Sequence, residues 1–531
     1  MRLGFRQSRA WLHTWAGLIT GWVMFAVFVT GTATYYRADI SLWMRPELRA
    51  GPSEPAPAAE RGLAYLKAHA PKAMAWYVSL PQPDRPLIGV YWMYSLEAPL
   101  GQATLDIGTG APTVARDTQG GDFLYRFHTE LQMMPRIGRW IVGASALILL
   151  VALVSGIVTH RRIFSDFFTF RRDKAAQRAW LDAHNVTGVL ALPFHLMITY
   201  TGIVTLALMY MPWGVTTAYK GEAPAFYAES GQTTAPRPPA GRPGTLSPIG
   251  PMVREAMARV PEPLERLSVL NPRDANATVV AVFEEPHGLS HAHPQVAFDG
   301  VTGAVREVRQ GGLKPATRTF TTMVGLHEAH FAGPALRILF FVCGLMGSAM
   351  VATGLVLWSV ARLPKPGERS FLGLRLVQAL NIGAVAGLPG AIAAYFLANR
   401  LLPVDLGQRA DWEIAAFFGV WALVTLAALA GPQRRAWRVA LSVTAGLYLA
   451  VVAADIARVD HDWAGLLEGE ARFVWFDATL LALAALFAVA ARKVARYAPP
   501  RRAGRGAPAP EATRRTPLAQ APQTADALAE A

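Results

Sequence analysis

Residues 11–31 read WLHTWAGLITGWVMFAVFVTG, and residues 180–202 read WLDAHNVTGVLALPFHLMITYTG. Each stretch places a histidine at the start of an apolar run, followed by two glycines at the same spacing, Gly17 and Gly31 in the first and Gly188 and Gly202 in the second. Runs of this kind approach the roughly 20 apolar residues that a helix needs to cross about 30 Å of hydrocarbon. Because backbone groups in lipid must be satisfied within the chain, we expect both stretches to be membrane helices.

Apolar residues gather in further runs of the same length. The chain has 531 residues, of which 52% are hydrophobic, and a soluble protein of this size would rarely carry so many. The sequence therefore predicts a polytopic α-helical membrane protein with about eight transmembrane helices. The expected spans are residues 15–36, 138–159, 185–211, 335–358, 372–398, 412–430, 437–456 and 472–491.

The basic residues that produce the net charge of +14 are clustered at particular connections between these spans. Basic clusters precede span one, separate spans two and three, and follow spans four, six and eight. All of them fall on one side of the membrane if the N-terminus is cytoplasmic, which is the positive-inside pattern. Topology thus accounts for the charge, and we expect membrane lipid but no nucleic acid as a partner.

Two long polar segments leave the membrane on the opposite side, which is the periplasm in a cell with two membranes. Each is expected to form a small α+β unit with one amphipathic helix, two strands and a D-x-x-T-G turn, at 106–110 and 299–303. The predicted division is a first membrane helix (1–36), a first periplasmic domain (37–136), helices two and three with a basic cytoplasmic loop (137–211), a second periplasmic domain (212–333), helix four (334–361), four additional helices (371–492) and a disordered basic cytoplasmic tail (493–531).

The order helix–outer domain–helix thus occurs twice, which indicates a tandem duplication with a symmetry axis along the membrane normal. This symmetry places His13 opposite His184 near the cytoplasmic side and His128 opposite His327 near the outer side. Neutral imidazole binds haem iron, which takes two axial ligands in electron carriers, and facing helices can hold a cofactor between them. We therefore predict two b-type haems, each held by two histidines.

Two further histidines are alternative ligands. His160 closes span two and could replace His13. His195 follows His184 within the third span. On an unbroken helix it would lie about 16 Å deeper on nearly the same face, where it could replace His184 or relay protons or electrons.

The remaining histidines are expected to have no cofactor role. His291 and His293 lie in the sequence HGLSHAH (residues 287–293), which is interpreted as a solvated loop rather than a loose metal site. His330 is interpreted as a neighbour of the ligand His327, and His69 and His461 as surface residues. No metal beyond haem iron is predicted.

Other cofactor and catalytic motifs are absent from the sequence. The single cysteine, Cys343, excludes a disulfide framework, and there is no C-x-x-C-H haem attachment, H-E-x-x-H helix or glycine-rich phosphate loop. No catalytic acid, base or nucleophile is predicted. Electrons would have to come from a cytoplasmic partner or a membrane quinol.

Several of these motifs together resemble the PepSY-associated transmembrane helix family. They are WLHTWAGLITGW, the two outer D-x-x-T-G units, THRRIFSDFFTFRR (159–172) and WLDAHNVTGVLALPFHLMITYTG, and the likeness covers about residues 5–360. It implies PepSY-like periplasmic domains, location in the bacterial inner membrane, and, as in some members, reduction of ferric siderophores with two b-type haems. By this likeness His13, His128, His184 and His327 are the haem ligands, with His160 and His195 as alternatives.

The expected function is a di-haem reductase that moves electrons to the periplasm and reduces a ferric siderophore or another iron chelate, because ferrous iron is held weakly and released. Two other classes are weighed against it. The outer domains could belong to a non-enzymatic regulator or sensor, which leaves the paired histidines unexplained. The four additional helices, which contain no recognisable chemical motif, could instead belong to a permease for iron chelates.

Overall fold

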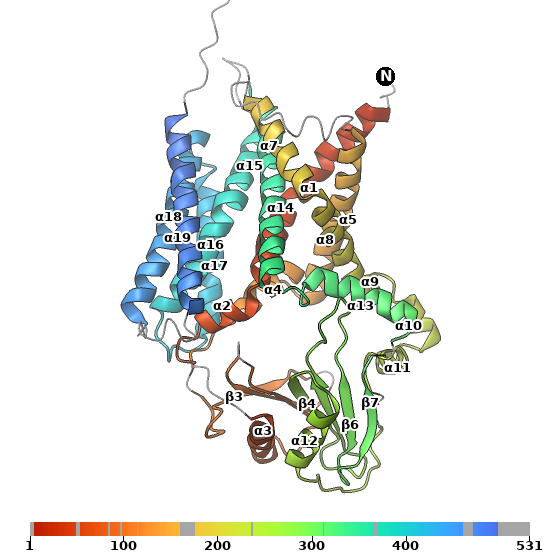
Figure 1. The fold of residues 1–531 in the computed structure, drawn as a ribbon. Helices are drawn as coiled ribbons and strands as arrows, with labels where there is room; N and C mark the ends of the chain where they lie inside the picture. Colours follow the sequence, from red (N-terminus) through yellow and green to blue (C-terminus); the bar gives the residue numbers. More distant parts are fainter. Residues whose placement is uncertain are drawn as a thin grey trace, which may run out of the picture. The chain divides into compact units, whose positions relative to one another are not determined.

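The computed structural model of the chain describes residues 5–48, 54–82, 85–95, 98–113, 115–159, 176–234, 237–311, 313–364, 370–459 and 471–497. Seven helices in these ranges are long and apolar enough to cross a membrane, and a bent helix pair makes an eighth span if it is counted as one. The chain is therefore a multi-pass helical membrane protein, as the sequence predicts (Figure 1). The segments are α1 (Phe5–Thr34), α5 (Pro135–Thr159), the bent pair α7 (Ala176–Leu190) and α8 (Leu192–Thr205), α14 (Pro334–Val360), α15 (Leu372–Ile382) continued by the π-helical η1 (Gly383–Gly387) and α16 (Leu388–Leu401), α17 (Arg409–Ala427), α18 (Gln433–Arg458) and α19 (Ala471–Arg496).

The third span is broken, and the prediction of one helix over 185–211 is wrong in this respect. The chain bends by 69° between α7 and α8. Pro193 lies in the first turn of α8, where proline is tolerated, but it has no N–H to continue the hydrogen bonds of α7, and its ring crowds the carbonyl four residues earlier. α8 then ends at Thr205 and is followed by the short helices α9 (Ala207–Tyr210), α10 (Trp213–Ala218) and α11 (Ala223–Glu229).

The two extramembrane segments form one sheet rather than the two separate α+β units that were expected. Its seven strands run in the order β3-β2-β1-β4-β5-β6-β7, and every pair is antiparallel. The join is between β1 and β4, where Ala75 pairs with Leu270 and Ser79 with Arg266. Joining them covers two strand edges that would otherwise be open to pairing with other chains. The strands are β1 (Ala75–Ser79), β2 (Ile88–Met93), β3 (Gly101–Leu105), β4 (Leu264–Leu270), β5 (Thr278–Phe283), β6 (Gln295–Asp299) and β7 (Val305–Arg309).

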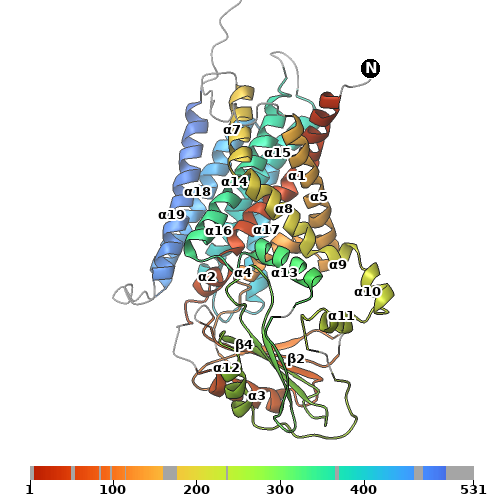
Figure 2. The ribbon, with the colours of Figure 1, turned by 45° about the vertical axis from the view of Figure 1, so that its right-hand side comes forward.

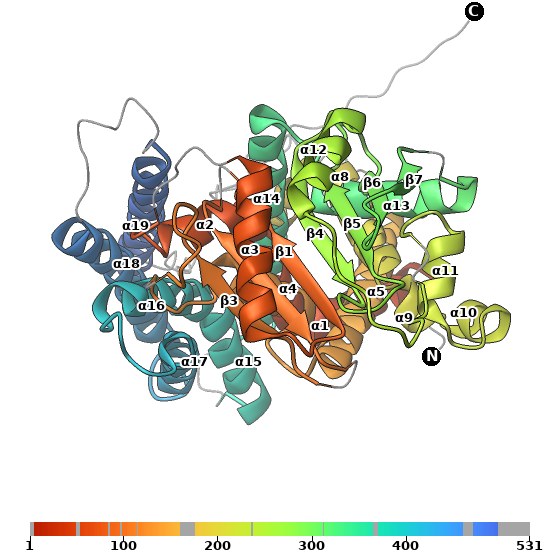
Figure 3. The same ribbon diagram turned by 90° about the horizontal axis from the view of Figure 1, so that it is seen from below.

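Two amphipathic helices, α3 (Pro55–His69) and α12 (Ile249–Arg259), lie side by side over one face of this sheet (Figure 3). The core between helices and sheet includes Leu66 and Val253 from the helices and Val78, Val269 and Phe298 from the strands, all with at most 1% of their surface exposed. Each extramembrane segment thus contributes one amphipathic helix, as expected.

The two D-x-x-T-G turns follow β3 and β6. Asp106 accepts hydrogen bonds from the backbone N–H and hydroxyl of Thr109, and these bonds lower the pKa of Asp106. Burial would raise the pKa of Asp299, but hydrogen bonds from the backbone N–H of Thr302 and from Arg237 lower it. The acidic residue of each motif therefore closes its turn as a carboxylate.

Three short helices lie between the membrane helices and the sheet: α2 (Arg37–Trp43), α4 (Gly121–Glu130) and α13 (Pro315–Glu328) (Figures 1 and 2). We call this end of the helix bundle the sheet side. Within the bundle α1 packs against α5 and α14, α14 packs against α7, and α5 packs against α8. α4 packs on α1 and α5, and α13 packs on α8.

The four C-terminal membrane segments pack around α16, which contacts α17 and α18. They are joined to the first part of the bundle by Asn381, which accepts a hydrogen bond from Nε1 of Trp22 on α1 and donates one to the carbonyl of Leu355 on α14. α19 continues to Arg496, so the first residues of the predicted disordered tail are helical. Tyr497 follows the helix, and the residues from 498 onward lie outside the described ranges.

Candidate functional site

Four histidines that the sequence singles out lie together as two pairs of imidazole rings. The rings of His13 on α1 and His184 on α7 have centroids 6.1 Å apart and planes inclined at 65°. The rings of His128 on α4 and His327 on α13 have centroids 6.0 Å apart and planes inclined at 26°. We call the first the N-end pair, because His13 lies near the start of α1, and the second the sheet-side pair.

Each of the four rings is held from behind by a backbone carbonyl on a different helix. Since a carbonyl can only accept, Nδ1 must carry the proton, and the lone pair lies on Nε2. Histidines that bind metals are commonly oriented in this way. The hydrogen bonds run from Nδ1 of His13 to Ala152 O (2.9 Å), of His184 to Met350 O (2.8 Å), of His128 to Val27 O (2.8 Å) and of His327 to Ile198 O (3.1 Å).

Four glycines make room for these rings. A Cβ atom on Gly31 would lie 2.5 Å from Nδ1 of His128, and one on Gly202 would lie 2.8 Å from Cε1 of His327. A Cβ on Gly156 or Gly354 would lie 3.2 or 3.1 Å from Cε1 of His13 or His184, respectively. The glycine-rich helix faces therefore position the histidines, whereas other glycines of the same helices only allow close packing, such as Gly347 against Phe28.

The spacing of both pairs suits a single metal ion between two imidazoles. A metal–imidazole bond is about 2 Å long, and the ring centre lies roughly 1 Å beyond the nitrogen. Two rings on opposite sides of one ion should therefore have centroids about 6 Å apart, which is the separation in both pairs.

The sheet-side pair is neutral. Burial lowers the pKa of His128, and burial together with the neighbouring His128 lowers the pKa of His327 to about 3. Neutral imidazole is the form that coordinates iron.

An apolar groove of about 400 Å³ runs along α5 next to the N-end pair. Its lining consists of α5 side chains between Leu150 and Val158 together with Arg9, which lies one turn before His13 on α1. Its valines Val151, Val154 and Val158 are between 42% and 50% exposed, so the groove opens on the outer surface of the bundle, and neither His13 nor His184 lines it.

The family model described as PepSY-associated TM region matches residues 10–361. The chain belongs to this family. The match runs from the start of α1 to the end of α14 and contains both histidine pairs, the sheet and the bent third span. A protein of Pseudomonas aeruginosa described as uncharacterised is 29% identical over 399 residues, which cover 71% of this chain and 96% of that relative. The C-terminal helices from α15 onward lie beyond the family region.

His195 of this PepSY-associated TM protein does not lie three turns along a straight helix from His184, as was expected, because the break before α8 separates them. Its side chain is fully buried and packs edge-on against Phe28 and Phe194. Backbone groups of Gly188 and Cys343 lie near the ring, but neither ring nitrogen makes a hydrogen bond of standard geometry with a described residue. His195 lies one turn before the carbonyl of Ile198 that holds His327, so it belongs to the surroundings of the sheet-side pair.

The other histidines divide into three groups. His160 and His461 lie outside the described residues, so the structure places neither. His69 is exposed and stacks on Tyr65, and His287 is exposed in its loop. His291, His293 and His330, by contrast, lie together with glutamates on the sheet side, which the interpretation of a plain solvated loop did not anticipate.

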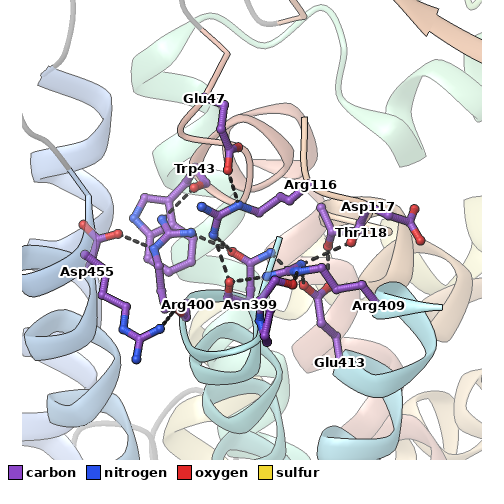
Figure 4. A network of polar contacts seen from close by, with 12 residues as sticks. Trp43, Glu47, Arg116, Asp117, Thr118, Asn399, Arg400, Arg409, Glu413 and Asp455 are labelled. Atoms are coloured by element: carbon purple, nitrogen blue, oxygen red, sulfur yellow. Dashed lines mark hydrogen bonds and ion pairs between the residues drawn. The ribbon is translucent and has the colours of Figure 1, made fainter. Parts of the chain in front are cut away.

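A buried polar network joins α16 and α17 to the first part of the family fold (Figure 4). Arg400 pairs with Asp455 of α18, and its guanidinium lies over the ring of Trp43 on α2. Arg409 pairs with Glu413, which also accepts hydrogen bonds from Thr118 and Asn399. Arg116, which lies with Thr118 in the segment between β3 and α4, donates a hydrogen bond to the Asn399 carbonyl. All four charged side chains of the two pairs have no exposed surface.

These helices contain no recognisable sequence motif, although their charged residues offer a usable signal. Charged residues within or at the ends of apolar spans are costly unless paired, so Arg400, Glu413 and Asp455 could have been singled out on that ground. Arg409 pairs with Glu413 on the next helical turn, whereas Arg400 donates to the carbonyl of Trp43 on the distant α2. Because the partners have no common separation along the chain, residue spacing does not reveal the network.

Proposed function

We propose that this protein is a di-haem b reductase of the bacterial inner membrane that passes electrons outward to a ferric siderophore or a similar iron chelate. The observation that carries the proposal is the geometry of the two histidine pairs: the ring centroids are 6.1 Å apart in one and 6.0 Å apart in the other, and each ring has its Nδ1 anchored on a carbonyl. In this proposal His13 and His184 would hold one haem, and His128 and His327 the other.

The chemistry of the donor set fits this cofactor. A haem with two imidazole ligands changes between ferric and ferrous iron and so supplies one-electron transfer. The residues contribute rigid placement: the anchored Nδ1–H groups fix the rings, and the facing glycines allow the close approach.

The distance between the two pairs follows from α1. His13 and Val27, whose carbonyl holds His128, both belong to this unbroken helix. At about 1.5 Å per residue the pairs are therefore separated by roughly 21 Å along the helix axis. One pair would thus lie near each membrane face, as transfer across the bilayer requires.

The direction of transfer rests on the positive-inside pattern, which puts the N-terminus and the N-end pair on the cytoplasmic side. The sheet would then be periplasmic, with its two parts as PepSY-like units of a tandem duplication. A cytoplasmic protein or a quinol would donate electrons, and the chelate would be reduced on the sheet side.

The test is the visible spectrum and haem content of the purified full-length protein, oxidised and then reduced with dithionite. We expect b-type bands and two haems per chain, and one haem per chain in His128→Ala and in His327→Ala. His69→Ala, which changes an exposed histidine, is the matched control and should keep two. Colourless protein from haem-sufficient cells would refute the proposal and favour a regulator or a permease, and two haems in both ligand variants would refute the pairing.

A further inference from the structure

Three histidines and two glutamates from distant segments lie together on the sheet side of the protein. Glu285 follows β5, and His291 and His293 precede β6. Glu328 ends α13, and His330 follows it. Their ligand atoms form two groups, Glu285–His291–His293 and His291–Glu328–His330, and within each group these atoms all lie within 4.8 Å of one another.

The β5–β6 loop is fixed against α13. The backbone N–H of His291 donates to the Thr321 carbonyl at 3.0 Å, and the hydroxyls of Ser290 and Thr321 are 2.7 Å apart. Gly325 allows the close approach, because a Cβ there would overlap the carbonyl oxygen of Leu289. The loop is therefore held in place by contacts that do not involve the clustered imidazoles.

The end of α13 turns its side chains back toward this loop. Ala329 has a φ of 57° and forms a left-handed cap, which is uncommon for a residue other than glycine or asparagine. Beyond this cap, Nδ1 of His330 lies 3.4 Å from a Glu285 oxygen, and its Nε2 lies 3.6 Å from a Glu328 oxygen. Both elements thus contribute ligands to one place.

The separations match those of ligands around one ion. With metal–ligand bonds of about 2.1 Å, neighbouring ligand atoms lie roughly 3 to 3.5 Å apart and opposite ones about 4 Å apart. Nε2 of His293 is 3.4 Å from Glu285, and Nδ1 of His291 is 3.7 Å from Glu328. His293 also has its Nδ1 2.9 Å from the Phe283 carbonyl, so this ring has an orienting partner like those of metal-binding histidines.

We propose that Glu285, His291 and His293 form a binding site for a divalent first-row transition metal ion, with Glu328 and His330 beside it in a second group that shares His291. Imidazole and carboxylate ligands suit Fe²⁺, Zn²⁺ and Mn²⁺ and do not favour the soft Cu⁺ ion. Glu285 is only 10% exposed and has contacts with all three histidines, which places it at the centre of the site.

The position of the site gives it a role, and this step rests on the proposed function. Glu328 directly follows His327 of the sheet-side pair, at the end of the same helix. Ferrous iron released from a reduced chelate would therefore appear beside a ligand set that binds Fe²⁺. The site would hold the product ion and keep it from the chelator.

The test measures metal binding by the full-length protein in detergent after treatment with EDTA. Zn²⁺ is the first probe because it does not change the redox state of haem, and bound zinc is counted by mass spectrometry after equilibrium dialysis. We expect one zinc per chain that is lost in His291→Ala/His293→Ala and bound at least about tenfold more weakly in Glu285→Gln. His287→Ala, an exposed histidine of the same loop outside the cluster, is the matched control and should bind like the wild type.

Equal zinc in the wild type and the double variant, or no zinc in the wild type, would overturn the site. Glu285→Gln has nearly the size of the native residue and gives an independent reading if the double variant does not fold. Haem content is measured on the same samples. A protein that binds zinc but no haem would contradict the proposed reductase and leave the proposed metal site intact. A protein that binds haem but no zinc would contradict the metal site and leave the reductase intact. Anaerobic dialysis against Fe²⁺ that leaves no non-haem iron on the wild type would refute the role in product capture.

Discussion

The contact between Gly31 and His128 allows a sharp test of the sheet-side pair. In Gly31→Ala the new methyl group would lie 2.5 Å from Nδ1 and 2.6 Å from Cε1 of His128, whereas ordinary contacts begin near 3.4 Å. The imidazole would have to move by about 1 Å to restore an ordinary van der Waals separation. The hydrogen bond from Nδ1 to Val27 O, now 2.8 Å, would lengthen beyond the usual limit for such bonds.

The fold should survive this change. Losing one hydrogen bond costs about 1 kcal/mol and displacing a packed ring about 1–3 kcal/mol, whereas replacing glycine by alanine inside a helix recovers about 1 kcal/mol, so the net loss is about 1–3 kcal/mol. The proposed haem site at the sheet-side pair should not survive unchanged. Losing the partner that orients a ligand weakens metal binding by about 10–100-fold. Here the ring also moves away from its position opposite His327, where the two centroids are 6.0 Å apart.

We therefore expect Gly31→Ala to be purified in normal yield with one haem per chain. Haem is measured as the pyridine haemochrome, and a redox titration shows which of the two haems remains. Gly446→Ala on α18 is the matched control, because a Cβ there meets no atom within 4 Å, and it should retain two haems. Two haems with unchanged midpoints in Gly31→Ala would show that His128 is not held as described or is not a ligand.

Four further outcomes follow from the structure. In a ferric haem with two imidazole ligands, the angle between the imidazole planes sets the splitting of the iron d orbitals. The N-end pair at 65° should therefore give a more anisotropic low-spin EPR signal than the sheet-side pair at 26°. Two identical signals would contradict these geometries. His195→Ala should retain both haems, since in the proposed reductase the paired histidines would supply every axial ligand, and loss of one haem would indicate that His195 is a ligand. Asp455→Asn should remove the carboxylate paired with the buried Arg400 and lower the Tm, by less than the roughly 3–5 kcal/mol of a fully unpaired buried charge because Asp477 also interacts with Arg400, and an unchanged Tm would argue against this ion pair. The folded-state pKa values of Asp106 and Asp299 are lowered from 3.8, so their turns contribute stability above that pH and lose it as the pH falls through the lowered values. Thermal unfolding should therefore be less acid-sensitive when both residues are replaced by Asn. Equal acid sensitivity would show that the two carboxylates do not stabilise the turns.

The membrane spans and the histidine pairs could be predicted because both depend on patterns among residues that are close together in the sequence. Apolar runs reveal their own length, and the equal spacing of His13 from Gly31 and of His184 from Gly202 singles out the two histidines as a matched pair. The anchoring carbonyls could not be predicted, since they belong to helices far along the chain and a carbonyl has no sequence signature.

The single sheet and the metal-ligand cluster were missed for a related reason. Both depend on contacts between segments distant in the chain. The edge of β1 gives no sign that it pairs with β4, because two membrane spans separate these strands in the sequence. The histidines of HGLSHAH look like a solvated loop until Glu328 and His330 are brought beside them by the left-handed turn at Ala329.

The break before α8 makes the two ligand-bearing arms unequal. In both arms the same length of chain separates a ligand histidine from the residue whose carbonyl anchors the sheet-side pair: His13 from Val27, and His184 from Ile198. The first arm is straight and spans about 21 Å, whereas a 69° bend near the middle shortens the second to roughly 17 Å. A rotation that superimposes His13 on His184 therefore cannot also superimpose Val27 on Ile198, so the two-fold relation between the arms is only approximate. In the proposed reductase each haem would therefore lie between two unlike arms, and its two axial histidines would have different surroundings.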